Sequence, residues 1–150
     1  MTNTTYRELA NAVFDKIKDI DFANMDEEIA YQIVISYMRS AIVAFQSATQ
    51  DLSDRDDELA QFNFRLSDNT FVILVNYMII EWLTSNFILT SNALKSRLST
   101  SDFHSLNLHN QLSKATELRN TLKAENDQLA INKSYKNSKI FDIVSKRKKV

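Results

Sequence analysis

Apolar residues in the first third of the chain recur at steps of three and four, which is the spacing of one face of an α-helix. The first stripe covers residues 6–17 and follows a candidate cap at Thr4 or Thr5. The second follows the acidic residues 26–28, which suit the positive end of a helix dipole, and we expect this helix to run to about Thr49. The apolar positions of the two stripes are Tyr6, Leu9, Ala10, Val13, Phe14, Ile17, Ile29, Ile33, Val34, Tyr37, Met38, Ala41, Ile42 and Phe45.

The most apolar segment is FVILVNYMIIEWL, residues 71–83, which continues into Phe87, Ile88 and Leu89. A polar residue within 67–69 can cap it. Asn76 and Glu81 interrupt the segment before it reaches the roughly 20 apolar residues that a membrane span needs. We therefore expect a buried central helix, with Trp82 as an anchor of the core; a Trp82 that faces a partner is the alternative.

A fourth helix is predicted after a cap at Ser101 or Asp102. It has an apolar seam on one side and charged residues on the other, so it can pack within the bundle or against another subunit. The seam consists of Leu106, Leu108, Leu112, Ala115, Leu118, Leu122 and Leu129.

Between the second and third helices the period changes, because Phe62, Phe64 and Leu66 alternate with polar residues as they would in an extended strand. The acidic stretch 51–58 precedes this segment, but it lacks the glycine that a calcium-binding EF-hand loop requires, so a solvated loop is favoured. The fold class that follows is all-α: a bundle of about four to five helices, more than half of the residues helical, with a short extended segment near residues 61–66 and a C-terminal arm.

Charge divides the chain into two parts. Residues 133–150 carry seven Lys or Arg and one Asp, a charge of +6, which leaves −7 for the rest of a chain whose net charge is −1. We predict a helical bundle domain over residues 1–132 and a basic, partly apolar arm over 133–150. Such segregation is typical of an arm that binds something negative, and apolar residues among the lysines favour a segment that orders on a partner.

Missing residue types exclude several classes of site. The chain has no glycine, so phosphate-binding loops, dinucleotide fingerprints and nucleophile elbows cannot form in their usual way, and it has no cysteine for disulfides or thiolate metal sites. His104 and His109 would lie about 140° apart on a helix, which is poor geometry for chelating a metal. No nucleophile is paired with a base in sequence, so we expect no enzyme, no metal and no cofactor.

Two further expectations concern location. The N-terminus, MTNTTYRELANAV, has no basic region followed by an apolar stretch, so a secretory signal is not expected. The absence of cysteine is consistent with a reducing compartment, and synthesis and folding in the cytoplasm are expected.

The order of these features resembles the head-tail connector proteins of tailed bacteriophages, the small helical adaptors beneath the portal. The likeness covers residues 6–140: a helical first half, an acidic break, the apolar helix with IIEWL, then LKSRLSTSDF, a long helix and a basic tail with SYKNS. It implies a structural virion protein of the neck, made in the host cytoplasm, that forms a ring, commonly a dodecamer, and contacts a further neck or tail protein. DNA would pass through the channel without specific binding, and the acidic stretch 51–58 would suit the channel wall or an inter-subunit face. No membrane would be involved.

The resemblance also implies that the C-terminal segment reaches the portal protein. Its candidate partner-binding residues are Tyr135, Ile140, Phe141, Ile143, Val144, Lys146, Arg147, Lys148 and Lys149. Two alternatives stay open from the sequence: a small nucleic-acid-binding regulator, which the basic end favours and the acidic body opposes, and a generic helical interaction module.

Overall fold

The computed structural model describes the backbone of residues 2–17, 24–89 and 102–136, with the side chains of 2–17, 24–86 and 112–133. Helix accounts for 68% of the described residues, so the predicted all-α bundle is confirmed. The elements are α1 (Tyr6–Lys16), α3 (Glu27–Ser36), α4 (Met38–Ala44), strands β1 (Arg55–Asp56) and β2 (Gln61–Phe62), α5 (Asp68–Leu83), the π-helical turn η1 (Thr84–Leu89) and α7 (Asp102–Lys136).

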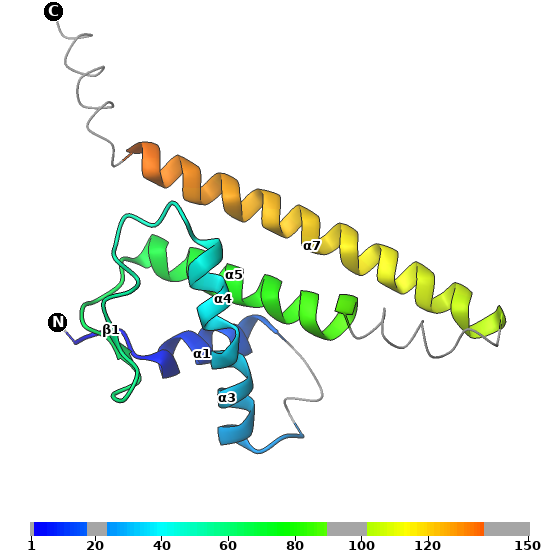
Figure 1. Cartoon of the computed structure of the whole chain (residues 1–150), viewed down its shortest axis with the longest axis horizontal. Helices are drawn as coiled ribbons and strands as arrows, with labels where there is room; N and C mark the ends of the chain where they lie inside the picture. Colours follow the sequence, from blue (N-terminus) through cyan, green and yellow to red (C-terminus); the bar gives the residue numbers. More distant parts are fainter. Residues whose placement is uncertain (1, 18–23, 90–101, 137–150) are drawn as a thin grey trace, which may run out of the picture.

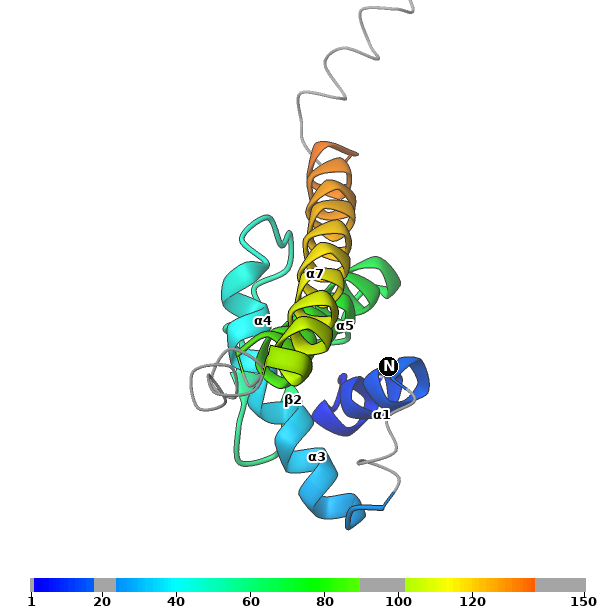
Figure 2. The ribbon, with the colours of Figure 1, turned by 90° about the vertical axis from the view of Figure 1, so that its right-hand side faces the viewer.

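Helix α5 lies at the centre, and α1, α4 and α7 all pack against it (Figures 1 and 2). Its N-cap is Ser67, whose hydroxyl accepts a hydrogen bond from the backbone N–H of Thr70. Because nearly every turn of α5 carries apolar residues on several sides, the helix must be covered all round. The buried positions are Thr70, Ile73, Leu74, Val75, Tyr77, Met78, Ile80 and Leu83.

Helix α1 begins with a capping box. The Thr5 hydroxyl accepts from the backbone N–H of Glu8, and the Glu8 carboxylate accepts from the backbone N–H of Thr5 at 2.7 Å. The predicted apolar stripe of this helix is the buried one, because Tyr6, Leu9 and Val13 all face the core.

The second predicted helix is two helices, which corrects the expectation of one helix to Thr49. The Ser36 hydroxyl donates to the carbonyl of Ile33, and the N–H of Tyr37 turns to the carbonyl of Val34 at 3.1 Å instead of continuing the four-residue ladder. Helix α4 then ends at Ala44, because Phe45 leaves helical geometry and packs its ring on Tyr77, with centroids 5.7 Å apart.

The predicted extended segment is partly confirmed, since β2 starts at Gln61, but it is not the sole strand: β1 pairs with it antiparallel. The acidic residues of this region cap turns. Asp51 accepts from Ser53, and Asp56 accepts from the backbone N–H groups of Glu58 and Leu59. Ala60 closes the hairpin at φ 51°, a left-handed conformation that a glycine-free chain must give to another residue.

This hairpin ties the N-terminus to the core. The backbone of Thr4 exchanges hydrogen bonds with Phe62 and Phe64, and the Phe62 ring is 0% exposed and meets the Tyr6 ring edge-on. Trp82, in contrast, packs against the core but is only partly buried, so the expected anchor is less enclosed than Phe62.

Truncation of the Phe62 side chain tests this assignment. Phe62→Ala should lower the free energy of unfolding by about 3–5 kcal/mol, because it removes a fully buried ring. The matched control is Val43→Ala, at a side chain that is 73% exposed, where the change should stay within about 0.5 kcal/mol. Urea denaturation followed by circular dichroism measures both, and equal losses would contradict the assignment.

A second prediction concerns the capping box and pH. The backbone hydrogen bond from Thr5, with further help from Arg65 at 2.7 Å, holds the pKa of Glu8 below its ordinary value of 4.5. A carboxyl whose pKa is lower in the folded state stabilises the fold fully above its ordinary pKa and loses that effect as the pH falls through the folded pKa. The urea midpoint of Glu8→Gln should therefore lie below that of the wild type at pH 7, and the gap should shrink below pH 4.5. A gap that stays constant to pH 3 would contradict this role.

Candidate interaction surface

The face of α7 that meets α5 has a buried polar contact at its centre. Asn126 is buried, donates to the backbone carbonyl of Ile73 at 3.1 Å and accepts from the Asn76 amide at 3.2 Å. Ala130 is the other buried residue on this face among the described side chains of α7. Sequence reasoning did not identify Asn126, although an asparagine within a helical repeat is a known device for fixing helix pairing.

A second polar contact follows on the same side. The Tyr77 hydroxyl donates to Asp127 at 2.6 Å, and Lys123 pairs with the other carboxylate oxygen of Asp127 at 2.8 Å. Burial raises the pKa of Tyr77, and the hydrogen bond to Asp127 raises it further. Burial alone would raise the pKa of Asp127, but its bonds with Lys123 and Tyr77 leave that pKa lowered. These directions identify a neutral phenol that donates to an ionised carboxylate.

The apolar seam of α7 consequently does not fill the bundle. Leu118 is 52% exposed and Leu129 is 51% exposed, while Leu122 is partly buried against the core. We call Leu118, Leu122 and Leu129 the leucine strip. Of the described seam positions, Leu112, Ala115 and Leu122 are partly buried while Leu118 and Leu129 are exposed, so the seam lies only partly within the bundle of one chain. The side chains of Leu106 and Leu108 lie outside the described ones.

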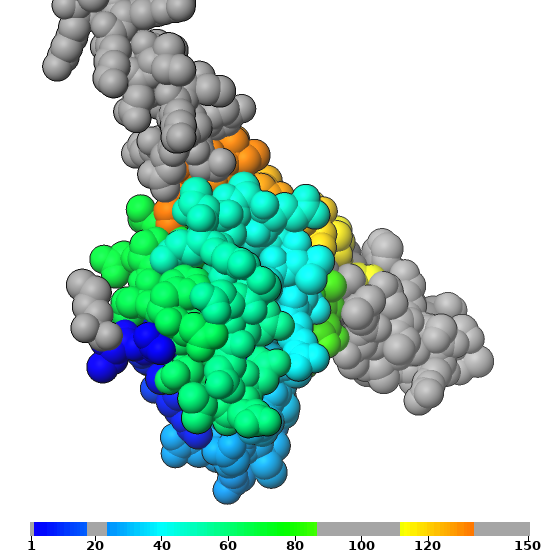
Figure 3. All heavy atoms as spheres, turned by 60° about the vertical axis from the view of Figure 1, so that its left-hand side comes forward, coloured from blue at the N-terminus to red at the C-terminus, as the bar shows by residue number. Residues whose placement is uncertain are grey.

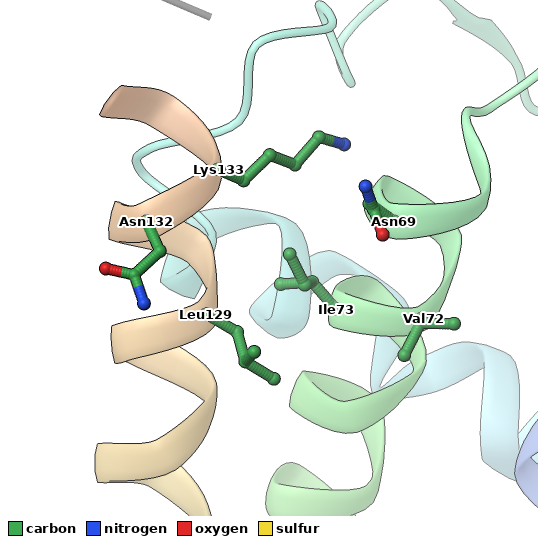
Figure 4. Close-up of a pocket in the computed structure, with 6 residues that line it drawn as sticks. All are labelled: Asn69, Val72, Ile73, Leu129, Asn132 and Lys133. Atoms are coloured by element: carbon green, nitrogen blue, oxygen red, sulfur yellow. The ribbon is translucent and has the colours of Figure 1, made fainter. Parts of the chain in front are cut away.

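Two cavities adjoin the strip where α5 and α7 run side by side. One of about 310 Å³ lies between Leu129 and the α5 residues Val72 and Ile73, and Figure 4 shows Leu129 and Ile73 pointing into the space between the helices. Another, of about 210 Å³, is lined by Leu122, Leu129 and Ile79 among others. Val72 is itself 44% exposed, so the apolar surface of α5 continues that of the strip.

Lys133 closes the end of this groove. Its ammonium group donates to the Ser67 hydroxyl at 2.9 Å and also to the Thr70 hydroxyl, so the last turns of α7 are tied to the first turn of α5. Figure 4 shows the Lys133 side chain extending from α7 toward the start of α5. Burial lowers the pKa of Lys133. The sequence assigned Lys133 to the arm, and nothing in its pattern indicated this contact, which joins residues far apart in the chain.

Most of the predicted partner-binding residues follow the described end of α7 in the chain. Helix α7 continues past residue 132 to Lys136, so the backbone of Tyr135 is helical, while its side chain is not among those described. Ile140, Phe141, Ile143, Val144, Lys146, Arg147, Lys148 and Lys149 lie outside the described residues.

A second groove, of about 510 Å³, is charged and is lined by α1, α3, α4 and the hairpin instead of α7. At its centre Asp57 accepts from the Tyr6 hydroxyl at 2.6 Å and from Arg39 at 3.4 Å. The Tyr6 hydrogen bond is the main reason why the pKa of Asp57 is lowered. Figure 3 shows the N-terminal residues beside the hairpin segment on this side of the molecule. These charges are engaged with one another, which is the pattern of a structural cluster.

Two further properties of the described residues concern metal binding and membrane crossing. Among the described side chains, those of residues 2–17, 24–86 and 112–133, no group of three or more His, Cys, Asp or Glu is placed to hold a metal ion. Within residues 2–17, 24–89 and 102–136, no helix combines the length and the apolar character that crossing a bilayer demands. The surface around the leucine strip is therefore the strongest candidate site in the described structure.

The Asn126 contact yields a prediction. Asn126→Ala should lower the free energy of unfolding by about 1–3 kcal/mol, because it leaves the Asn76 amide and the Ile73 carbonyl without their partner in a buried place. Gln128→Ala, at an exposed amide two residues along the same helix, is the control and should change stability by less than about 0.5 kcal/mol. Urea denaturation compares them, and a neutral Asn126→Ala would show that α7 is held by other contacts.

Comparisons with protein-family models, with curated proteins and with solved structures found no match to this chain. The likeness to head-tail connectors therefore stays a prediction from the sequence.

Proposed function

We propose that this protein is a structural adaptor that assembles by protein contacts, and specifically a head-tail connector that binds a portal protein through its C-terminal segment. The all-α bundle fits such a role. So does the way in which the charged groups around Asp57 and Asp127 are used, since each is bound to neighbouring side chains and none is aligned as a nucleophile with a base. In the proposed setting the copies form a ring beneath the portal, in the neck of the virion, and contact a further neck or tail protein.

The observation that carries the proposal is the fixed exit of a basic segment from an acidic body. Lys133 ties the end of α7 to Ser67 and Thr70, so the chain after Lys136 starts from a defined place on the bundle. Residues 133–150 bear +6 and the remainder bears −7. A segment of this charge is suited to an acidic partner surface, because opposite charge speeds the encounter.

Charge and apolar character have separate roles in this proposal. Lys146, Arg147, Lys148 and Lys149 steer the segment, so they act on the rate of association. The apolar residues fill pockets on the partner, so they act on the rate of dissociation. This set is Tyr135, Ile140, Phe141, Ile143 and Val144.

Truncation after Lys136 tests the proposal while keeping all of α7. Deleting residues 137–150 should leave the thermal midpoint of the bundle within about 2 °C, because the Lys133 contacts and the core remain, as a loss of no more than about 0.5 kcal/mol implies. Binding to purified portal assemblies encoded by the same genome should be abolished. Thermal melts and electron microscopy of the mixtures are the measurements.

Two full-length variants serve as controls for the truncation. Replacing Lys146, Arg147, Lys148 and Lys149 by glutamine should slow association and flatten its salt dependence, whereas Phe141→Ser with Ile143→Ser should speed dissociation even at high salt. Unchanged portal binding by the truncated chain would overturn the role of the segment. Tight, salt-sensitive binding to duplex DNA, lost on the same truncation, would instead favour the nucleic-acid regulator.

A further inference from the structure

The leucine strip has the spacing of a helix-pairing seam. Leu118, Leu122, Glu125, Leu129 and Asn132 follow one another at steps of four, three, four and three, which is the heptad alternation of coiled coils. At 100° per residue these positions stay on one side of α7. The pattern extends toward the N-terminus through Ala115.

This seam adjoins the side of α7 that holds the helix to α5. The α5-facing positions, among them Arg119, Asn126 and Ala130, lie about 100° further round the helix. Leu118 and Leu129, each about half exposed, are left on a second side. Leu122 lies between the two sides and is partly buried against the core. The bundle of one chain therefore uses the Asn126 side of α7 and leaves Leu118 and Leu129 about half exposed.

Charge along the strip indicates what the second face pairs with. Lys114 and Glu125 lie on the same edge of the seam, one on each side of Leu118 and Leu122. If a second α7 runs antiparallel with its Leu122 opposite Leu118, three residues forward on one helix correspond to three residues back on the other. Glu125 of each copy then lies level with Ala115 of its partner, and Lys114 is the next residue on the same edge.

A parallel arrangement lacks this match. It would place Glu125 beside Glu125 in the seam, so that like charges meet, and it would leave Lys114 about 16 Å along the helix from the partner's Glu125. The antiparallel arrangement is instead self-complementary: two leucine pairs in the middle and one Lys114–Glu125 ion pair on either side. A two-fold axis between the helices generates both halves at once.

We propose that two copies of this chain pair through antiparallel α7 helices, with the leucine strip as the interface and Val72 of α5 at its margin. Both copies use the same surface, which leaves none free for a third copy. The free protein is therefore a dimer. The inference stands on the strip alone and is independent of the C-terminal segment and of the portal.

Sedimentation of the full chain over a range of concentrations tests the pairing. The wild type should sediment as a dimer, and Leu118→Lys should raise the dissociation constant at least about tenfold, because it puts a charge at the centre of the interface. Asn120→Lys adds the same charge at an exposed position on the other side of α7 and should leave the dimer intact. Circular dichroism checks that all three chains are folded, which the exposure of both positions favours.

A charge exchange tests the antiparallel register. Lys114→Glu alone and Glu125→Lys alone should each weaken the dimer several-fold, since each opposes like charges, and the double variant should restore it. A parallel pair would not show this rescue, because the two positions would be about 16 Å apart along the helix. A monomeric wild type, an assembly larger than two, insensitivity to Leu118→Lys or a double variant that is not rescued would each overturn the proposal. If the wild type forms the dimer but does not bind the portal, the proposed function is contradicted and the pairing is not.

Discussion

The constraint on which the fold depends is the apolar character of α5 on all sides. A helix whose buried Ile73, Val75, Met78 and Leu83 lie on different sides cannot lie on a surface, so other segments must surround it. Helices α1, α4 and α7 do so (Figure 2). The hairpin at β1 and β2 completes the cover by placing Phe62 under the start of α1.

Polar residues decide how α7 lies on this core. A buried asparagine with two partners is satisfied in one register, whereas a face made of leucines tolerates several, so Asn126 and the Tyr77–Asp127 bond fix both the rotation and the axial position of α7. As a consequence, the side chains of Leu118 and Leu129 stay about half exposed. A helix rotated to bury Leu118 and Leu129 would bring Asn126 out of its bonds with Ile73 and Asn76.

The same helix links the core to the basic segment. Because α7 is held by Asn126 in its middle and by Lys133 near its end, its last turns are part of the bundle and not a free extension. A partner that binds the residues after Lys136 would therefore be attached to a helix that is fixed on the bundle. The leucine strip lies along this helix, so the proposed antiparallel pairing of two copies would place their two basic segments at opposite ends of the pair.

The sequence by itself determined the helical class, the central place of residues 71–83, the buried stripe of α1 and the division of charge, because hydrophobic periodicity and composition are local properties of the chain. It did not determine the break at Tyr37, the β1 strand or the partial exposure of Trp82. Those depend on a side-chain bond to a carbonyl, on turns built by aspartates and on packing between distant segments. The leucines of α7 were visible in the pattern, but which side of that helix meets α5 was decided by tertiary structure, because only contacts across the fold satisfy the buried amide of Asn126.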